Sequence, residues 1–229
     1  MDLYGETFSD LRLQGDTFSS GVVEDCLFTR CRFQEVTLEN FQVTGCQFVD
    51  CTFAGLHYKN MSCLNNAFQH CALSGVEWSA LLDPRKLDLG FLPFESFSQC
   101  VLHHNVFYSL DLQKFDFHGC DLTGSSFDEC DLRQADFSGC ALSGTIFSHN
   151  DLRGADFRRA SGYSLSLETN QGRGARFSLP EHRPGGVTSV LTFPPPGGKI
   201  VPRNFHHRTP GGAFPRGLRH AQNKRRERP

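Results

Sequence analysis

The sequence has few of the features that mark a membrane or secreted protein. Its 229 residues include one Trp and two Met, and only 38% are hydrophobic, which is low for a compact globular domain. No stretch approaches 18 consecutive apolar residues, so no membrane span is expected. The N-terminus, Met1-Asp2-Leu3, has no basic segment followed by an apolar run, so no signal peptide is expected. These absences predict a cytoplasmic protein.

Signatures of catalysis are also missing. There are ten Cys but no Cys-x-x-Cys pair, and no Gly-x-Ser-x-Gly, P-loop or dinucleotide fingerprint. The adjacent pairs His103-His104 and His206-His207 diverge on an extended chain, which disfavours a shared metal ion. We therefore expect no catalytic residue, no cofactor and no metal site, and we expect that the chain is not an enzyme.

The charge is unevenly distributed. Residues 1–180 contain 13 Lys and Arg against 23 Asp and Glu, a net charge of −10. Residues 181–229 contain 10 against 2, a net charge of +8. The chain therefore has an acidic body and a basic tail, which are interpreted separately.

A five-residue repeat of apolar side chains runs through the acidic body. Phe alone supplies 22 residues, which is a reason to look for such a repeat. We call the recurring apolar position the centre. From Leu92 onward the centres alternate strictly between Leu and Phe. The centres are Leu3, Phe8, Leu13, Phe18, Val23, Phe28, Phe33, Leu38, Val43, Phe48, Phe53, Tyr58, Cys63, Phe68, Leu73 and Trp78, then Leu92, Phe97, Leu102, Phe107, Leu112, Phe117, Leu122, Phe127, Leu132, Phe137, Leu142, Phe147, Leu152 and Phe157.

Small side chains recur two residues before the centre. Nine of the ten Cys occupy this position, and Cys63 is itself a centre. The cysteines are therefore explained as small inward-facing hydrophobic residues, in ladders such as Cys31, Cys51 and Cys71, without disulfides or metal.

A period of five fits neither a helix nor a plain strand, which have periods of 3.6 and 2. It fits a short extended segment followed by a tight corner, with the centre and the residue two before it on one face. The corner favours a positive φ two residues after the centre, where Gly, Asn or Asp is preferred. Eleven of the fifteen corner positions from Gly5 to Gly75 carry one of these residues.

The units Ala155-Asp156-Phe157-Arg158-Arg159 and Cys120-Asp121-Leu122-Thr123-Gly124 resemble the A(D/N)Lxx unit of the pentapeptide-repeat family. The resemblance covers about residues 3–160. It implies an all-β fold, a right-handed, four-sided parallel β-helix in which four repeats make one coil. On such a solenoid Phe97, Phe117, Phe137 and Phe157 stack on one face, and Phe107, Phe127 and Phe147 stack on the opposite face.

The frame divides the chain into five segments. Residues 1–78 and 92–160 are expected to form two sets of coils. Residues 79–91 break the register and are expected to form a loop or a one-residue slip, with Pro84 and Gly90 favouring a bulge. Residues 161–180 are a frayed cap segment. Residues 181–229, rich in Pro, Gly and Arg, are expected to be disordered, and we interpret them as a frame-shifted or replaced C-terminus.

Carboxylates occupy the outward position just before many centres of the second block. We interpret them as a candidate partner-binding surface, an acidic rod that could enter a basic DNA-binding groove. The alternative is that Asp at this position bonds the backbone at corners. The seven residues are Asp111, Asp116, Asp121, Asp131, Asp136, Asp151 and Asp156.

The register break supplies a second candidate, because loops on a solenoid often carry binding. The alternative is a benign junction between two sets of coils. The candidate contact residues are Asp83, Pro84, Arg85, Lys86 and Asp88.

The resemblance extends to the quinolone-resistance and microcin-immunity type of pentapeptide-repeat proteins. It implies a DNA mimic that engages DNA gyrase or topoisomerase IV and protects it from poisons. We expect no direct nucleic-acid binding by the rod and no membrane contact. A homodimer stays open, since the terminal pairing segment of that group is not recognisable here. The alternative is a scaffold module with an unrelated protein partner.

Overall fold

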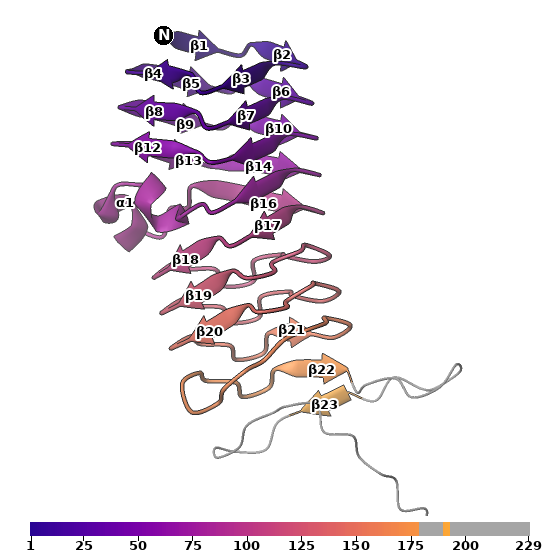
Figure 1. Cartoon of the computed structure of the whole chain (residues 1–229). Coiled ribbons are helices and arrows are strands. Elements are labelled where there is room, and N and C mark those ends of the chain that lie inside the picture. The colour runs from indigo at the N-terminus through magenta and orange to yellow at the C-terminus, as the bar shows by residue number, and fades with distance from the viewer. Residues whose placement is uncertain (179–189, 193–229) are drawn as a thin grey trace, which may run out of the picture.

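Backbone hydrogen bonds between residues about four repeats apart in the sequence organise the chain into stacked coils (Figure 1). This is a computed structural model, and it describes residues 1–178 and 190–192. Each coil has four sides, and parallel pairing of successive coils turns each side into one face of a solenoid. The predicted four-sided parallel β-helix is confirmed.

Four parallel sheets form the N-terminal half, one on each face. Face 1 carries β1 (Asp2–Tyr4), β5 (Gly21–Glu24), β9 (Phe41–Thr44) and β13 (Ser62–Leu64). Face 2 carries β2 (Thr7–Ser9), β6 (Leu27–Thr29), β10 (Gln47–Val49), β14 (Asn66–Gln69) and β16 (Phe94–Ser98). Face 3 carries β3 (Arg12–Gln14), β7 (Arg32–Gln34), β11 (Thr52–Ala54), β15 (Ala72–Ser74) and β17 (Val101–His103). Face 4 carries β4 (Thr17–Phe18), β8 (Thr37–Glu39) and β12 (His57–Lys59).

The C-terminal half keeps the four faces but has fewer strands. On face 4 lie β18 (Val106–Tyr108), β19 (Ser126–Asp128) and β20 (Ile146–Ser148). Elsewhere single bridges link the coils, and tight turns close the corners through bonds such as Cys120 N–H to Phe117 O (3.0 Å). The pair β21 (Asp156–Phe157) and β22 (Arg176–Ser178) ends face 2, and β23 (Val190–Thr192) pairs antiparallel with β22.

The coils extend beyond residue 160, where the sequence placed their end. Ser161 bridges Ala141, Gln171 bridges Asp151, and the ring of Phe177 stacks on that of Phe157 with centroids 5.1 Å apart. The segment predicted to fray thus adds another coil. The predicted disorder of residues 181–229 lies outside the described residues, apart from the strand β23.

The corners adopt a left-handed backbone whatever residue they carry. Positive φ occurs at the predicted position two residues after the centre, at Gly5 (62°) and Asp10 (58°) and also at Arg30 (53°) and Glu35 (51°). This conformation costs a non-Gly residue about 1 kcal/mol. The pairing between coils therefore imposes the corner on residues that disfavour it.

The register break is an insertion that leaves the strand columns of faces 2 and 3 intact, while the sheets of faces 1 and 4 end before it. Phe48 pairs with Phe68 at the ordinary spacing, whereas Phe68 pairs with the more distant Phe97, with a bulge between Asn66 and Ala67. The extra residues form a 3₁₀ helix, η1 (Trp78–Leu81), and a short helix, α1 (Pro84–Asp88), which protrudes from the solenoid (Figure 1). The prediction of a bulge at Pro84 is wrong, because Pro84 begins this helix behind the N-cap Asp83.

Columns of identical rings fill the centre of the solenoid. Nine Phe rings, one per coil, run along face 2, with stacked pairs such as Phe117 and Phe137 (5.0 Å, 6°). On face 4, Phe107 and Phe127 stack at 4.5 Å, and they meet the face 2 rings edge-to-face, as Phe117 meets Phe127 at 5.5 Å. The predicted opposite Phe columns are confirmed. The face 2 rings are Phe8, Phe28, Phe48, Phe68, Phe97, Phe117, Phe137, Phe157 and Phe177.

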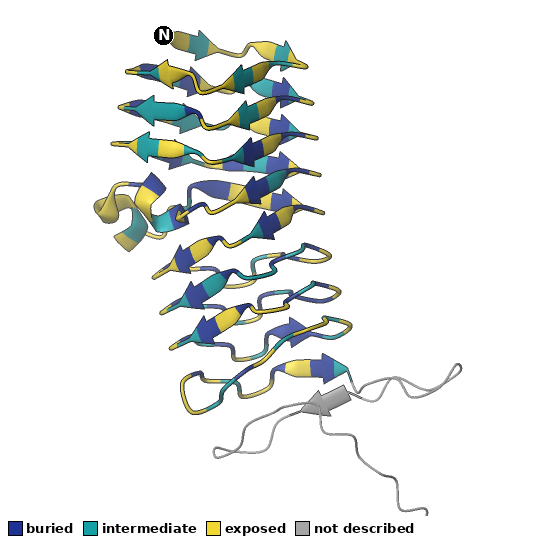
Figure 2. Cartoon of the chain, in the orientation of Figure 1, coloured by how far each residue is buried: buried dark blue, intermediate teal, exposed yellow. Residues whose placement is uncertain are grey.

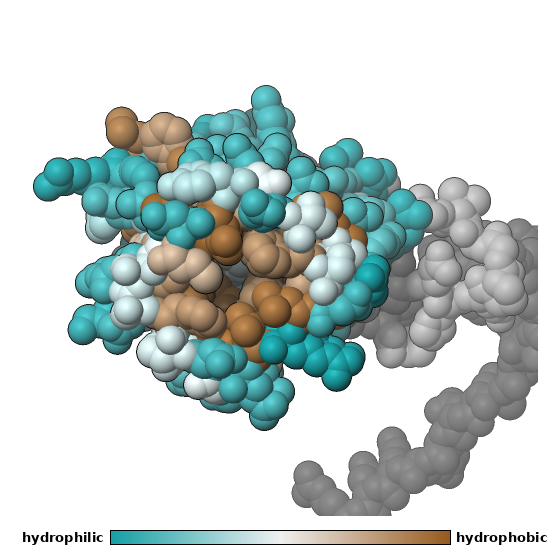
Figure 3. Space-filling model, turned by 90° about the horizontal axis from the view of Figure 1, so that it is seen from above, coloured by the Kyte–Doolittle hydropathy of each residue, from teal (hydrophilic) through white to brown (hydrophobic). Residues whose placement is uncertain are grey.

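The two halves are not equally filled (Figure 2). In the C-terminal half Leu112, Leu132 and their neighbours are fully buried, whereas many centres of the N-terminal half are only half-buried. An apolar cavity of about 370 Å³ lies within the first four coils and includes Met1, Leu3 and Trp78 in its lining. Figure 3 looks down on the N-terminal end and shows this hollow ringed by hydrophobic residues. We call this cavity the lumen.

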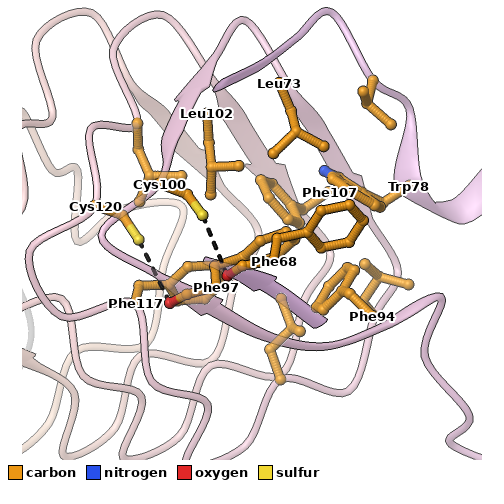
Figure 4. Close-up of a cluster of buried hydrophobic side chains, with 14 of the residues drawn as sticks. Phe68, Leu73, Trp78, Phe94, Phe97, Cys100, Leu102, Phe107, Phe117 and Cys120 are labelled. Carbon is orange, nitrogen blue, oxygen red and sulfur yellow. Dashed lines mark hydrogen bonds between the residues drawn. The ribbon is translucent and has the colours of Figure 1, made fainter. Parts of the chain in front are cut away.

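Below the lumen, aromatic side chains on both sides of the insertion pack into the core. Trp78 packs edge-on against Phe94 at 5.0 Å and contacts Phe68 and Phe97, as Figure 4 shows. In the same region Cys100 and Cys120 donate to the carbonyls of Phe68 and Phe97 (Figure 4). The insertion therefore packs against the core at the junction of the two halves.

Because the two halves are packed differently, a Phe→Ala substitution is predicted to lower the free energy of unfolding by different amounts in the two halves. Phe127→Ala removes a ring that is fully buried in a column, and we expect it to lower the free energy of unfolding by about 3–5 kcal/mol. Phe8→Ala removes a half-buried ring beside the lumen and should cost clearly less. Urea unfolding of both variants measures the difference. Equal costs would contradict the unequal packing.

The left-handed corners predict opposite effects at two neighbouring positions. Lys114 (φ 61°) and Gly119 (φ 71°) lie at successive corners of one coil, and a Cβ at Gly119 would meet no atom within 4 Å. Lys114→Gly should raise the free energy of unfolding by about 0.5–1 kcal/mol, and Gly119→Ala should lower it by about 1 kcal/mol. Denaturant titration gives both signs, and a stabilising Gly119→Ala would refute the conformational explanation.

Candidate partner-binding surface

The seven predicted carboxylates lie where the four-sided geometry places them. Bridges connect Asp111 to Asp131 and Asp131 to Asp151 on face 1. On face 2 bridges connect Asp116, Asp136 and Asp156, and on face 3 Asp121 lies between Val101 and Ala141. Acidic side chains thus form two columns, with one carboxylate per coil.

Each of these carboxylates also bonds the backbone at its own corner. The side-chain oxygen accepts a hydrogen bond from the N–H two residues later, at 2.7–3.2 Å, which is the Asx-turn arrangement. The corner role, one of the two interpretations of these residues, is therefore observed at every one of them. The donors are the N–H groups of Gln113, His118, Thr123, Arg133, Ser138, Arg153 and Arg158.

Arginines two residues later neutralise part of the columns on faces 1 and 2. Arg133 pairs with Asp131 and also lies 3.8 Å from Asp151, which has its own partner in Arg153. The hydrogen bond from Arg133 holds the pKa of Asp131 below its usual value, and that from Arg153 does the same for Asp151. The sequence analysis did not predict these arginine partners, although the sequence Asp-Leu-Arg in both repeats indicates an ion pair between residues two positions apart.

Asp156 is the most deeply placed of the seven, with 3% of its surface exposed. Arg158 contacts it at 2.6 Å and Arg176, from the next coil, at 3.0 Å. Burial alone would raise the pKa of Asp156, but the hydrogen bonds from Arg158 and the charges of both arginines lower it on balance. The Asp156 carboxylate therefore stabilises the fold, and little of its negative charge is accessible to a binding partner.

Asp121 pairs with His103 across one coil at 2.8 Å. Burial raises the pKa of Asp121, but the hydrogen bonds from His103 and Thr123 outweigh it and lower the pKa. Within residues 1–178, the carboxylates left without a salt bridge among the seven are Asp111, Asp116 and Asp136. These three present the available negative charge of the predicted surface.

The N-terminal half shows alternating signs as well. Along one corner column Arg30 pairs with Asp10 at 2.8 Å, and His70 lies 3.5 Å from Asp50. The outer wall of the solenoid is therefore crossed by pairs that link neighbouring coils, and its negative charge is interrupted.

The insertion presents apolar as well as charged side chains. Asp83 accepts from Arg85 N–H at 2.8 Å and caps α1, while Pro84, Arg85, Lys86 and Asp88 are exposed. Leu89 and Phe91, which the sequence reasoning did not select, are 76% and 45% exposed. The loop thus combines two cations with two exposed apolar residues.

The cysteines are free and buried, and they do not form a metal site. Burial raises the pKa of Cys63 and Cys100 to about 12, which favours the protonated thiol. No group of three or more His, Cys, Asp or Glu in the described part of the chain could hold a metal ion. Across the same residues, no helix is long and apolar enough to cross a bilayer.

The pKa of Asp156 predicts a pH-dependent contribution to stability. Because its folded-state pKa lies below the ordinary value of 3.8, its stabilising effect is complete above that pH and is lost as the pH falls through the folded-state pKa. Asp156→Asn should lower the free energy of unfolding by about 1–3 kcal/mol at pH 7, with the difference shrinking toward pH 3.

Asp116→Asn is the matched control for this prediction. It keeps the corner bond at an exposed site that has no arginine partner, so the free energy of unfolding should stay nearly unchanged at both pH values. Denaturant titrations of the two variants at pH 7 and pH 3 make the comparison. A pH-independent difference for Asp156→Asn would refute the ion-pair explanation.

Comparison with known proteins identifies the repeat. Residues 95–163 match the family model described as a pentapeptide repeat region. None of the curated proteins matches the chain.

Several solved structures match the chain at low similarity. A trypsin-treated variant of QnrB1, a plasmid-mediated fluoroquinolone resistance protein, is 16% identical, covers 75% of this chain and 91% of its own, and has a TM-score of 0.47. HetL, a pentapeptide repeat protein involved in heterocyst differentiation regulation in Nostoc, is 11% identical with coverages of 75% and 87% and a TM-score of 0.26.

The match covers the middle of the solenoid, and the same five-residue frame of centres continues on both sides of it in the structure. The chain therefore contains a pentapeptide-repeat region.

Proposed function

We propose that the solenoid is a DNA-mimicking binding protein that engages a type II topoisomerase, DNA gyrase or topoisomerase IV, and protects it from quinolone-type or peptide poisons. The observation that carries the proposal is the net charge of −10 on residues 1–180, arranged on a continuous coiled rod. The resemblance of the repeat units to the quinolone-resistance type supports it. The proposal requires a cytoplasmic, non-enzymatic protein with a protein partner.

The spacing of the acidic side chains supports the same proposal. Successive coils lie about 4.8 Å apart, so a column offers one carboxylate per step, while each DNA strand carries one phosphate per about 3.4 Å. Nine coils give a rod about 40 Å long. Such a surface attracts a basic groove through electrostatic complementarity, which raises association rates and depends on salt.

Salt bridges decide which carboxylates serve this role. Asp131, Asp151 and Asp156 are held by arginines, so Asp111, Asp116 and Asp136 are the members of the predicted surface that a cationic partner reaches first. The exposed loop residues, Arg85, Lys86, Leu89 and Phe91, form a second contact region at mid-rod.

The arginine partners also favour the alternative, a scaffold module with an unrelated protein partner. A DNA mimic gains from unbroken negative charge, whereas Arg133, Arg153 and Arg158 interrupt it. A partner of a scaffold module would be insensitive to the free carboxylates.

The proposal predicts direct binding and protection. The purified chain should bind gyrase in low salt, lose affinity as salt rises, and preserve supercoiling by gyrase in the presence of ciprofloxacin. Supercoiling gels and biolayer interferometry measure the two effects. If the wild-type chain neither binds gyrase nor protects it, topoisomerase mimicry is refuted and the scaffold alternative remains.

A pair of double variants tests which carboxylates act. D116N/D136N should weaken gyrase binding about 3- to 30-fold at low salt, because two accessible charges are lost while Asn retains the corner bonds. E6Q/D16N removes the same charge from the first coil and should have a smaller effect. Equal losses in both would show that only net charge matters and would contradict a localised surface.

A further inference from the structure

The lumen of the N-terminal half lies inside the coils, whereas the proposed partner binds the outer wall. Face 1 of this half carries the small centres Val23, Val43 and Cys63, against Leu112, Leu132 and Leu152 in the C-terminal half. Protein interiors are normally close-packed, so an open apolar channel of about 370 Å³ is unusual. Apolar cavities of this size are typical of ligand-binding sites.

The channel is long and open at one end. It extends from Met1 and Leu3 in the first coil to Trp78 and Leu81 in the fourth, over about 15–19 Å at the strand spacing. A volume of about 370 Å³ over that length accommodates a single extended hydrocarbon chain. With carbon–carbon bonds of about 1.5 Å in a zigzag, a chain of about 12 carbons spans it.

The chemistry of the lining excludes a polar ligand body. The side chains that line the lumen are almost all aliphatic or aromatic, and a polar group placed among them would lose its hydration without a partner. The polar groups of the lining are few: His57, Asn66, whose amide is bonded to backbone groups, and the indole N–H of Trp78 at the far end.

Further polar groups lie at the mouth. There the first coil, residues 1–20, carries Asp2, Glu6 and Asp16 against Arg12, in addition to Asp10, which pairs with Arg30 of the second coil. The surplus of carboxylates disfavours an anionic head group.

We propose that the N-terminal half of the solenoid binds a single-chain alkyl amphiphile with a cationic head group, the chain of about 12 carbons lying in the lumen and the head group at the mouth beside Met1. The chain enters through the open N-terminal end seen in Figure 3, and its tip reaches Trp78. Burial of methylene groups supplies the affinity, and the carboxylates of the first coil select the head group.

Trp78 provides a direct readout, because it is the single Trp of the chain and lies at the closed end of the lumen. The probe is dodecyltrimethylammonium carrying bromine on carbon 12, used below its micelle concentration. It should quench the Trp78 fluorescence saturably with a stoichiometry of one, and unbrominated probe should reverse the quenching by competition. Affinity should rise about fourfold per methylene up to about 12 carbons and then level off. Dodecanoate should bind more weakly.

Filling the lumen gives the matched test. V23L/V43L/C63L copies the Leu centres of the C-terminal half onto face 1 and should weaken binding at least tenfold. V22L adds the same group on the outer side of β5 and should bind as the wild type does. V43L alone replaces the triple variant if circular dichroism shows that the latter does not fold, and should weaken binding at least threefold. Non-saturating quenching, absence of a chain-length plateau, or equal binding by the filled and wild-type proteins would overturn the proposal.

Discussion

The ladder of hydrogen bonds between successive coils is the constraint on which the whole structure depends. It fixes the position of every corner, so Arg30 and Glu35 accept a left-handed backbone that neither residue favours. It also places like side chains above one another, which turns single Phe residues into columns of stacked rings. Even the carboxylates follow this order, because Asp111, Asp131 and Asp151 stack for the same reason that the Leu centres do.

A strict period makes much of this fold predictable. The centres, the inward cysteines, the corner positions and the opposite Phe columns all follow from counting in fives, since each residue repeats one environment. The prediction was wrong where the period gave no information. The helix α1 behind Asp83 depends on a local cap inside an insertion, and the coil beyond residue 160 retains Phe177 as a centre after several irregular units. The lumen was missed as well, because apolar patterning places side chains inward but does not show how completely they fill the interior.

The candidate surface was predictable in position and less so in charge. Alternation places Asp116 and Asp131 outward, but their different character depends on whether Arg or another residue follows two positions later. Asp131 becomes part of an ion pair, whereas Asp116 keeps only its corner bond. The repeated Asp side chain thus stabilises its own corner in every one of these repeats, but its charge is available to a partner only in the repeats that lack an ion pair. The outer wall is charged and the lumen is apolar. A charged partner on the wall and an apolar ligand in the lumen would therefore contact different atoms.

The insertion that carries α1 has a wider consequence for how such a molecule changes in evolution. The strand columns of faces 2 and 3 continue across it, because the additional residues lie between Trp78 and Phe94 and leave the pairing of β14 with β16 and of β15 with β17 in place. A change in chain length preserves this pairing when it adds or removes a whole coil of four repeats, or when it forms an outgrowth such as the one that carries α1. The length of the rod and its outgrowths can therefore vary independently of each other.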